Sequence, residues 1–463
     1  MSTAVEHLEV SKIEELTSQL RGEIVMPSNA NYNETRKVYN GMIDKYPGLF
    51  AMCVDVADVM AAVNFGRDNN LLIAVRGGGH NGGGLGICDG GLVIDLSGIK
   101  FIRVDTSDNT VRVGGGNLWG EVDHATHPFG LAVPAGIIST TGVGGLTLGG
   151  GVGHLSRKYG LTIDNLLEAD MVLANGSFVT VSANENSDLF WAIRGGGGNF
   201  GIVTSFKFQA HPVKTVIGGP TLWPVEQTEE IMEWYHEFIH NVPDELNGFI
   251  ATMVIPGAPF PEELHNKKFC GIVWCYVGDP NKFDELFKPV LALNPLFAHV
   301  GEMPYPSIQT LFDGLLPHGL QWYWRADFFN ELGPEVRAGH LKFGSKIPTP
   351  LSQMHLYPIS GAASRVGNED TPWAYRDAKY AGVIVGVSPD PKDADKITDW
   401  CKAYWEALHP HSSGGAYSNF MMDEGQDRVK ASYKNNYDRL TKIKKKYDSN
   451  NLFRVNQNIK PAT

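Results

Sequence analysis

The sequence has few of the features that mark secreted, membrane-spanning or nucleic-acid-binding proteins. Its 463 residues include only five cysteines, none in a CxxC pair, so we expect buried free thiols in a reducing compartment and no disulfide framework. No stretch approaches about 18 consecutive apolar residues, so we expect no membrane-spanning helix. The polar, acidic N-terminal segment lacks the basic start and apolar core of a signal peptide, so a cytoplasmic location is expected.

Positive charge is also scarce. Lysine and arginine number 39 against 51 acidic residues, which gives a formal net charge of −12. An acidic chain binds nucleic acid and anionic membranes poorly, so neither is expected as a partner. We expect a small-molecule substrate and a monomer or small homo-oligomer.

Motifs for several common chemistries are missing. The chain has no GxxxxGK[ST] loop, no HExxH or other zinc-binding spacing, and no GxSxG elbow, so we expect no P-loop, no metal site and no serine hydrolase. The pattern GxGxxG does occur, at 77–82 and 196–201, but no helix pattern follows the first match. With 53 glycines such matches arise by chance, and a nicotinamide-type Rossmann site is disfavoured.

The pattern of apolar residues divides the chain into two parts. Helical and strand-like patterns alternate between about 46 and 215, and the Asn175-Gly176 pair predicts a hairpin over 168–182. Beyond about 212 aromatic residues and prolines become more frequent. There, strand-like runs at 269–277 and 320–329 alternate with helical ones at 226–241 and 393–408. This predicts a second α+β domain with an antiparallel sheet, followed by one amphipathic helix over 427–448 and an extended tail.

Glycine is the residue in excess, and it is clustered. Four clusters lie at 77–86, 114–116, 142–153 and 195–201. Glycine lets the backbone approach a ligand closely, so that its N–H groups can line an anion. Four such clusters in the first 200 residues predict a long, phosphate-bearing ligand lying in a trough.

Four longer motifs carry a family resemblance. "RGGGHNGGG" (76–84), "PAGIISTTGVGGLTLGGGVGHLSRKYGLTIDN" (134–165), "DLFWAIRGGGGNFGIVT" (188–204) and "YDSNNLFRVNQNI" (447–459) occur in order along the chain. Together they resemble the berberine-bridge-enzyme-like branch of the vanillyl alcohol oxidase and p-cresol methylhydroxylase (PCMH) type flavoproteins.

The resemblance implies an α+β fold: a two-lobed PCMH-type FAD-binding domain and a substrate domain whose antiparallel sheet roofs the flavin. The expected divisions are 1–215 for the FAD-binding domain (core about 46–215), 216–415 for the substrate domain, and 416–463 for a C-terminal segment that returns to the FAD domain. The residues expected at the cofactor are Arg76, Gly77, Gly78, Gly79, His80, Asn81, Thr140, Thr141, Gly142, Gly145, Gly149, Gly150, Gly153, His154, Ile202, Val203 and Asn456.

The resemblance also implies that His80 is bonded through a ring nitrogen to the 8α-methyl carbon of FAD. Many members carry a second attachment, a cysteine in PAGxC, but here Ile138 stands at that position. We therefore predict FAD held by a single covalent bond.

The expected reaction is removal of hydride from an alcohol, amine or phenol-type carbon, with O2 as acceptor and H2O2 as product. In the family a tyrosine of a Y-x-N segment often acts as base, which here is Tyr417 with Asn419; tyrosine has a pKa of about 10 and needs a cation or strong hydrogen bonds for this. His355 and Tyr323, on predicted roof strands, are further candidates, and Thr141 matches the position that gates oxygen. A dehydrogenase with another acceptor and an oxidative ring-closing enzyme of secondary metabolism remain alternatives.

Overall fold

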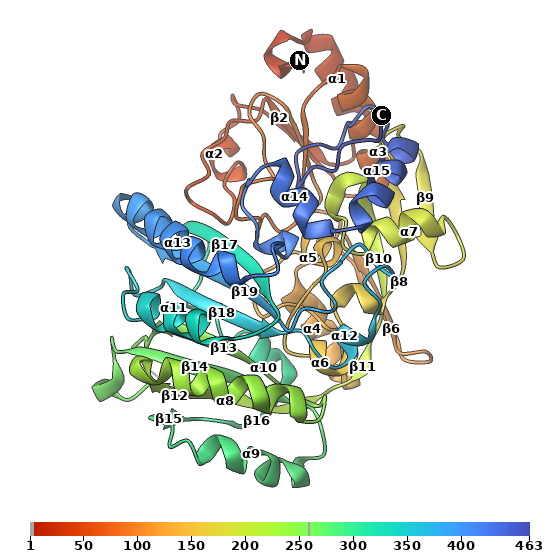
Figure 1. Cartoon of the computed structure of the whole chain (residues 1–463). Coiled ribbons are helices and arrows are strands. Elements are labelled where there is room, and N and C mark those ends of the chain that lie inside the picture. The colour runs from red at the N-terminus through yellow and green to blue at the C-terminus, as the bar shows by residue number, and fades with distance from the viewer. Residues whose placement is uncertain (1–3, 258–259) are drawn as a thin grey trace.

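The computed structural model describes residues 4–257 and 260–463, so residues 1–3 and 258–259 of the expected domains lie outside it. In Figure 1 the N-terminal elements lie at the top, the largest sheet lies at the lower left, and the C-terminal helices return beside the N-terminal part. Over the described ranges, helices long and apolar enough to cross a membrane are absent.

The first sheet has four strands in the order β1-β2-β4-β3. Strands β2, β3 and β4 are parallel, and their short apolar runs are buried on both faces, as is usual for parallel strands. One face packs against α1 and α3. The elements of this part are α1 (Val10–Gln19), β1 (Glu23–Val25), α2 (Tyr32–Thr35), β2 (Leu49–Met52), α3 (Val56–Asp68), β3 (Ile73–Arg76) and β4 (Leu92–Asp95).

The second sheet has five antiparallel strands in the order β5-β6-β10-β8-β9. The predicted hairpin is confirmed, because β8 pairs with β9 across a turn in which Gly176 has a φ of +80°. The elements of this part are β5 (Ile102–Asp105), β6 (Thr110–Gly114), α4 (Trp119–Thr126), β7 (Leu131–Ala132), α5 (Val143–Gly149), α6 (Ser156–Tyr159), β8 (Leu166–Val172), β9 (Phe178–Ser182), α7 (Ser187–Ile193), β10 (Ile202–Gln209) and β11 (His211–Pro212).

The third sheet is antiparallel, as the sequence predicts, and has eight strands in the order β15-β12-β14-β13-β18-β19-β17, with β16 paired to β12. Helices α8, α11 and α13 lie along one face of it (Figure 1). The elements are β12 (Thr215–Pro224), α8 (Thr228–Asn241), β13 (Leu246–Val254), β14 (Lys268–Tyr276), α9 (Phe283–Leu291), β15 (Phe297–Ala298), β16 (Gly301–Pro304), α10 (Tyr305–Gln309), β17 (Gln321–Phe329), α11 (Pro334–Gly344), β18 (Gln353–Pro358), α12 (Ala362–Arg365), β19 (Tyr380–Ser388) and α13 (Ala394–Leu408).

The C-terminal segment differs from the prediction of one helix. It forms α14 (Gln426–Tyr433) and α15 (Asn436–Tyr447), because Lys434 between them has a left-handed φ of +46° that no α-helix accommodates. Within α15, the buried Lys444 ammonium donates to the carbonyl oxygens of Asn199 and Phe453 and to Asp448. These bonds tie the extended tail to the glycine-rich loop around residue 199.

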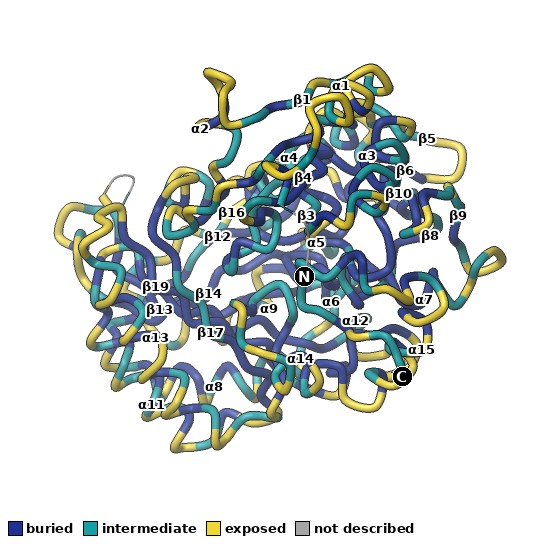
Figure 2. Tube along the Cα trace, turned by 90° about the horizontal axis from the view of Figure 1, so that it is seen from above, coloured by how far each residue is buried: buried dark blue, intermediate teal, exposed yellow. Residues whose placement is uncertain are grey.

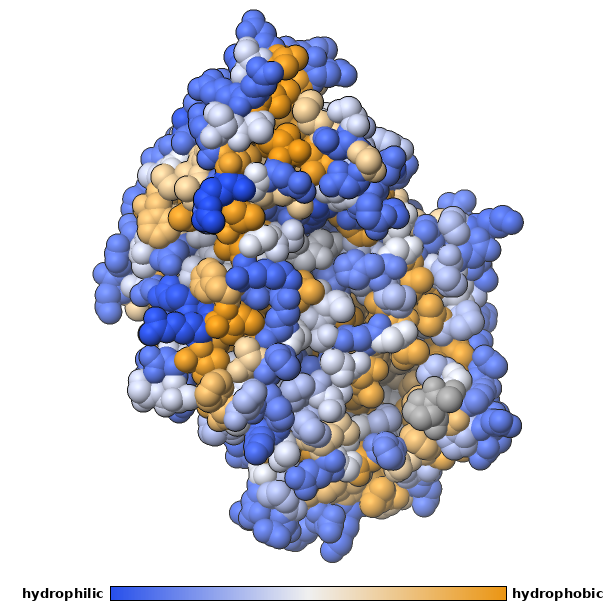
Figure 3. Space-filling model, turned by 180° about the vertical axis from the view of Figure 1, so that it is seen from behind, coloured by the Kyte–Doolittle hydropathy of each residue, from blue (hydrophilic) through white to orange (hydrophobic). Residues whose placement is uncertain are grey.

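Many of the buried residues belong to the three sheets. The strands form the buried interior and exposed residues gather on the peripheral loops and helices (Figure 2). The large exposed apolar side chains, such as Tyr46, Phe129 and Leu291, are scattered along the chain. On the face shown in Figure 3, the described apolar residues form small patches separated by polar ones. The described exposed apolar residues therefore form no single large patch on that face.

Candidate active site

A cavity of about 340 Å³ lies where the glycine-rich loops meet the third sheet. Its floor comes from residues 77–81, 136–148 and 197–203, and its roof from β17, β18 and β19. Residues 417–420 and 453–457 of the C-terminal segment complete the wall. Segments far apart in the sequence thus converge on one cavity.

Two of the floor loops touch through their glycines. A Cβ atom on Gly78 would lie 2.5 Å from the backbone nitrogen of Gly142, which is closer than real Cβ contacts, and Gly79 has a φ of +70°. Gly145 and Gly198, which also line the cavity, would meet no atom within 4 Å. Glycine is therefore needed in part for close packing of the loops and in part to keep the cavity open.

Arg76 ends β3 at the edge of the floor. Its guanidinium is paired with the buried carboxylate of Asp95 and donates to the carbonyl oxygen of Thr35. Asp95 also accepts from Ser97, so the cation and its counter-ion are both anchored. Arg76 lines the cavity, as predicted, but its charge is already balanced within the protein.

His80 is fixed in the floor by three neighbours. Its ring stacks on Tyr39 with centroids 3.9 Å apart, and the His318 ring meets its edge at 5.1 Å. Nε2 is hydrogen-bonded to the Thr140 hydroxyl at 3.1 Å. Burial, together with His318, lowers the pKa of His80 to about 3, so the imidazole is neutral at physiological pH.

The indoles of Trp322 and Trp324 line the roof from β17. Tyr323, predicted as a catalytic candidate, does not line the cavity: side chains alternate along a strand, so it points to the opposite face, beside the Lys402 ammonium of α13. The sequence predicts that Trp322 and Tyr323 lie on different faces of the strand. Helix α13 covers the face of Tyr323, which leaves the face of Trp322 to the cavity.

Strand β18 supplies three polar side chains to the roof: Gln353, His355 and Tyr357. The His355 ring lies between the other two, with Nε2 2.9 Å from the Gln353 Oε1 and Nδ1 2.9 Å from the Tyr357 Oη. Burial lowers the pKa of His355 to about 3. His355 thus reaches the cavity as predicted, in contact with two partners that were not predicted as catalytic.

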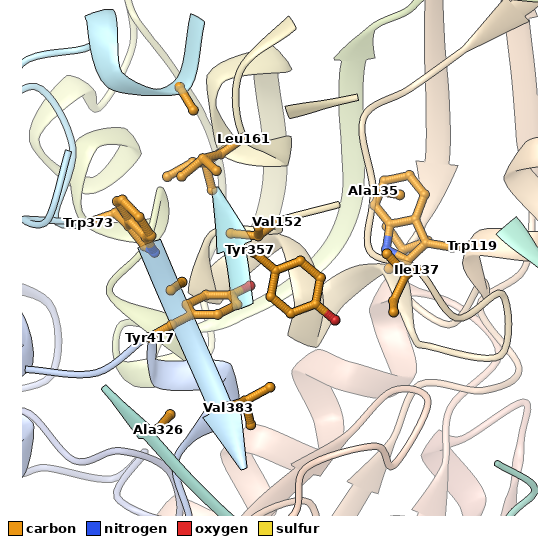
Figure 4. Packing of buried hydrophobic residues seen from close by; sticks show 14 of the residues in the cluster. Trp119, Ala135, Ile137, Val152, Leu161, Ala326, Tyr357, Trp373, Val383 and Tyr417 are labelled. Atoms are coloured by element: carbon orange, nitrogen blue, oxygen red, sulfur yellow. The ribbon is translucent and has the colours of Figure 1, made fainter. Parts of the chain in front are cut away.

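Tyr417 and Asn419 form the wall beside the roof. The Tyr417 oxygen accepts hydrogen bonds from the Gly151 backbone N–H and the Asn419 amide, both at 2.7 Å. Burial raises the pKa of Tyr417 well above its ordinary value, although both donors act in the opposite direction. Tyr417 and Tyr357 lie next to each other (Figure 4), and the ring of Phe420 contacts both.

The structure brings most of the predicted site residues to this cavity. Those that line it are Arg76, Gly77, Gly78, Gly79, His80, Asn81, Thr141, Gly142, Gly145, Ile202, Val203, His355, Tyr417, Asn419 and Asn456.

Five predicted cofactor residues do not line the cavity. Thr140 bonds to His80 instead, and the side chain of Asn419 packs against Gly149. The Trp373 ring packs against Gly150, the Ala135 carbonyl packs against Gly153, and the buried ring of His154 packs against Phe249. Gly150, Gly153 and His154 lie in the loop between α5 and α6, which supports the cavity from outside.

Sequence reasoning missed several lining residues. They are apolar or aromatic side chains, such as Tyr39, Leu146, Leu316, Phe420 and Phe453, of which Leu146 and Phe453 lie inside the quoted motifs. Their spacing resembles that of ordinary core residues, and only the fold shows that they face a cavity.

Comparison with known proteins agrees with this geometry. Residues 47–182 match the family described as FAD binding domain, and residues 416–460 match the one described as berberine and berberine like. An FAD-linked oxidoreductase of Dictyostelium discoideum is 32% identical over 97% of this chain and 97% of its own.

Two solved structures share the whole fold. One is 6-hydroxy-D-nicotine oxidase from Arthrobacter nicotinovorans, with a TM-score of 0.85 and 25% identity over 96% of this chain and 98% of that one. The other is the berberine-bridge-enzyme-like protein 1 of Physcomitrella patens, also with a TM-score of 0.85 and 25% identity, over 97% of this chain and 99% of that one. With these matches over nearly its full length, the chain belongs to the berberine-bridge-enzyme-like FAD-linked oxidoreductases of the PCMH type.

Proposed function

We propose that this enzyme is an oxidase that binds FAD through one covalent bond to His80 and oxidises an alcohol, amine or phenol-type carbon of a small molecule. The observation that carries the proposal is the imidazole of His80, which is buried, neutral and held in the glycine-rich floor of the cavity. Bound there, FAD would supply the two-electron acceptor for the substrate carbon and would pass the electrons to O2, giving H2O2.

The residues present suit a long, phosphate-bearing cofactor. Gly145 and Gly198 face empty space where any side chain would intrude, and the loops at 77–79 and 142–145 bring backbone to the cavity. Backbone N–H groups of such loops bind phosphate without added positive charge. Asn456 also lines the cavity, and its side-chain oxygen is buried without a hydrogen-bond partner, which leaves an acceptor for the N–H group of a ligand.

His80 has the properties of an attachment point. A nucleophilic imidazole must be neutral, and burial keeps this ring so. The hydrogen bond from Thr140 to Nε2 and the stacked Tyr39 ring hold the imidazole in one orientation in the cavity floor. A histidine that only contacted phosphate would instead be favoured in its charged form.

A second tether has no candidate among the described residues. Ile138 lines the cavity at the position where relatives of the doubly attached kind carry cysteine. The five cysteines of the chain are buried as free thiols outside the cavity lining. His80 therefore carries the attachment alone.

Other side chains position the substrate. Tyr417 is held by two donors, and Asn419, one of them, is itself anchored on the Leu146 carbonyl oxygen. The small Thr141 side chain in the floor leaves room for O2. His355 adds a neutral imidazole to the roof.

Acid precipitation tests the covalent bond. We expect a yellow pellet from the wild type and from His318→Phe, which removes the histidine at the edge of the site, and a colourless pellet with yellow supernatant from His80→Ala. The proposal fails if wild-type flavin is released, or if His80→Ala keeps it.

Reoxidation tests the acceptor. The flavin is first reduced by a substrate without oxygen, and air is then admitted. Full recovery of the oxidised spectrum within seconds, with one H2O2 released per flavin, supports an oxidase. Flavin that stays reduced for minutes contradicts it and indicates a dehydrogenase.

A further inference from the structure

The polar side chains of β18 form a row of hydrogen bonds in which donors and acceptors can be assigned. Gln353, His355 and Tyr357 alternate with Met354 and Leu356, which pack under the helices of the opposite face. Because the Gln353 carbonyl oxygen faces Nε2 of His355, that nitrogen carries the hydrogen. Nδ1 is then an acceptor, and the Tyr357 hydroxyl donates to it. Both partners are nine-tenths or more buried, so solvent does not replace these bonds.

The two tyrosines of the cavity therefore differ in what they can still do. A phenol has one hydrogen to donate and accepts through its oxygen. The Tyr417 oxygen already accepts from Gly151 and Asn419, so what it has left is its hydrogen, to donate. The Tyr357 hydrogen is committed to His355, so its oxygen is left to accept. A substrate hydroxyl would meet both needs if its oxygen accepted from Tyr417 and its hydrogen were donated to Tyr357.

The rest of the lining restricts the substrate. Arg76 is the one Lys, Arg, Asp or Glu among the described residues that line the cavity, and its charge is balanced by Asp95. Around the reacting groups lie Trp324, Val383, Val385 and Phe420. A charged group moved from water into such a space, without a partner, loses solvation that nothing replaces. Apolar and aromatic carbon, by contrast, gains from burial here.

We propose that Tyr357, backed by His355, accepts the hydroxyl proton of an uncharged, largely apolar alcohol whose oxygen is held by Tyr417. The proposal rests on the proposed function and names its substrate class and base. The substrate O–H bond breaks and its proton moves to the Tyr357 oxygen, as the Tyr357 proton moves to Nδ1 of His355. FAD, bound as in the proposed function, would accept the C–H hydrogen with its electron pair, and the carbon would become a carbonyl.

His355 acts on the substrate only through Tyr357, and its change of charge fits the reaction. The ring is neutral at rest and becomes an imidazolium when it takes the proton. The electron pair that leaves the substrate adds a negative charge to the cavity, and a nearby opposite charge favours the protonated ring. Facing this pair from other elements are Phe249, Phe312 and Tyr417. Of these only Tyr417 titrates, and burial holds its pKa far above neutral.

The rate of anaerobic flavin reduction in the holoenzyme tests the base. With uncharged aryl and allyl alcohols as reductants, we expect Tyr357→Phe to lower the limiting rate about 10²- to 10⁴-fold, the usual contribution of a base. The matched variant Tyr417→Phe should mainly raise the substrate concentration at half-maximal rate. Unchanged flavin spectra and thermal midpoints show that both variants fold.

A pH profile tests His355 separately. Gln353→Glu places a carboxylate beside Nε2, which raises the pKa of His355. At acid pH the ring of this variant is then already protonated and cannot take the proton from Tyr357. The rate of flavin reduction by the variant should therefore fall on the acid side, where the wild-type rate stays flat. Gln353→Met adds no charge and should keep the flat acid side. A flat profile for Gln353→Glu, or Tyr357→Phe within threefold of wild type, overturns the relay.

Matched alcohols test the substrate class. We expect 4-methylbenzyl alcohol to reduce the flavin at least tenfold faster than 4-(hydroxymethyl)benzoate or glucose at equal concentration. Faster reduction by the carboxylate or the sugar, or no reduction by any uncharged alcohol of the set, overturns the substrate class. The covalent flavin and the oxidase activity are read independently from the acid pellet and from reoxidation, so their failure is seen separately.

Discussion

Two glycine-to-alanine substitutions separate the packing role of the glycines from their role at the cofactor. Gly78→Ala brings a methyl group to 2.5 Å from the Gly142 backbone nitrogen, roughly 0.9 Å inside the 3.4 Å limit of ordinary contact. Both sides of this contact are backbone, so no rotamer change relieves it. Overpacking of this kind costs about 1–3 kcal/mol, and we expect the free energy of unfolding to fall by that amount.

Gly145→Ala is the contrasting change. It lies inside α5, and its Cβ would meet no protein atom within 4 Å. Alanine in a helix is favoured over glycine by about 0.5–1 kcal/mol, so the flavin-free protein should be slightly more stable. The methyl group enters the space we assign to FAD, however, and a similar overpacking cost there predicts about 5- to 150-fold weaker binding.

Both effects can be measured with standard assays. Protein produced under riboflavin limitation gives the denaturant midpoint without flavin, and FAD titration in the His80→Ala background gives the affinity. The reasoning is refuted if Gly145→Ala binds FAD as tightly as its parent, because the cofactor then avoids the α5 side of the cavity. It is equally refuted if Gly78→Ala is as stable as wild type.

Two further predictions concern buried charges away from the reaction. Lys444→Met should lower the free energy of unfolding in urea by about 3–5 kcal/mol, because it leaves the buried Asp448 carboxylate without its counter-ion. Lys446→Met, whose partner Asp188 is half-exposed, should lower it by at most about 1 kcal/mol. Equal losses would contradict the stabilising role given to the Lys444 hydrogen bonds. Burial raises the pKa of Asp123 to about 8, so the folded state keeps a proton that the unfolded state releases above about pH 4. The free energy of unfolding of the wild type should therefore fall between pH 4 and pH 8. Asp123→Asn lacks this titration, so its stability relative to wild type should rise over that range. A difference between the denaturation midpoints of the two proteins that is the same at pH 5 and pH 9 would contradict this.

The sequence was sufficient to predict the antiparallel third sheet and the glycine-rich floor. Both depend on patterns that are local in the chain: alternation along strands, and glycine where backbones meet. The tail shows the limit of such patterns. Apolar spacing continues through residues 427–448, yet the helix breaks at Lys434, which has a φ of +46°, and the second helix then places Lys444 against the loop at residue 199.

The sequence predicts which residues gather in the loops around the cavity, but not which of them face it. Glycines at 149, 150 and 153 share a motif with Gly142 and Gly145, yet they face Asn419, Trp373 and Ala135 instead of the cavity. A motif fixes which residues come together in a loop. Which of them face the ligand depends on the neighbours that the rest of the chain supplies.

The division of roles between Tyr417 and Tyr357 depends on contacts of the same non-local kind. Tyr417 receives one of its hydrogen bonds from Gly151, which is 266 residues earlier in the chain. Nothing in the Y-x-N segment reveals that its oxygen is already occupied. The spacing of Gln353, His355 and Tyr357 does predict a shared face of β18, and once the helices cover the other face, that polar face has only the cavity to meet. If Tyr357→Phe and Tyr417→Phe exchanged their expected effects, the accepting oxygen would have been assigned to the wrong tyrosine, while the covalent site at His80 would be unaffected.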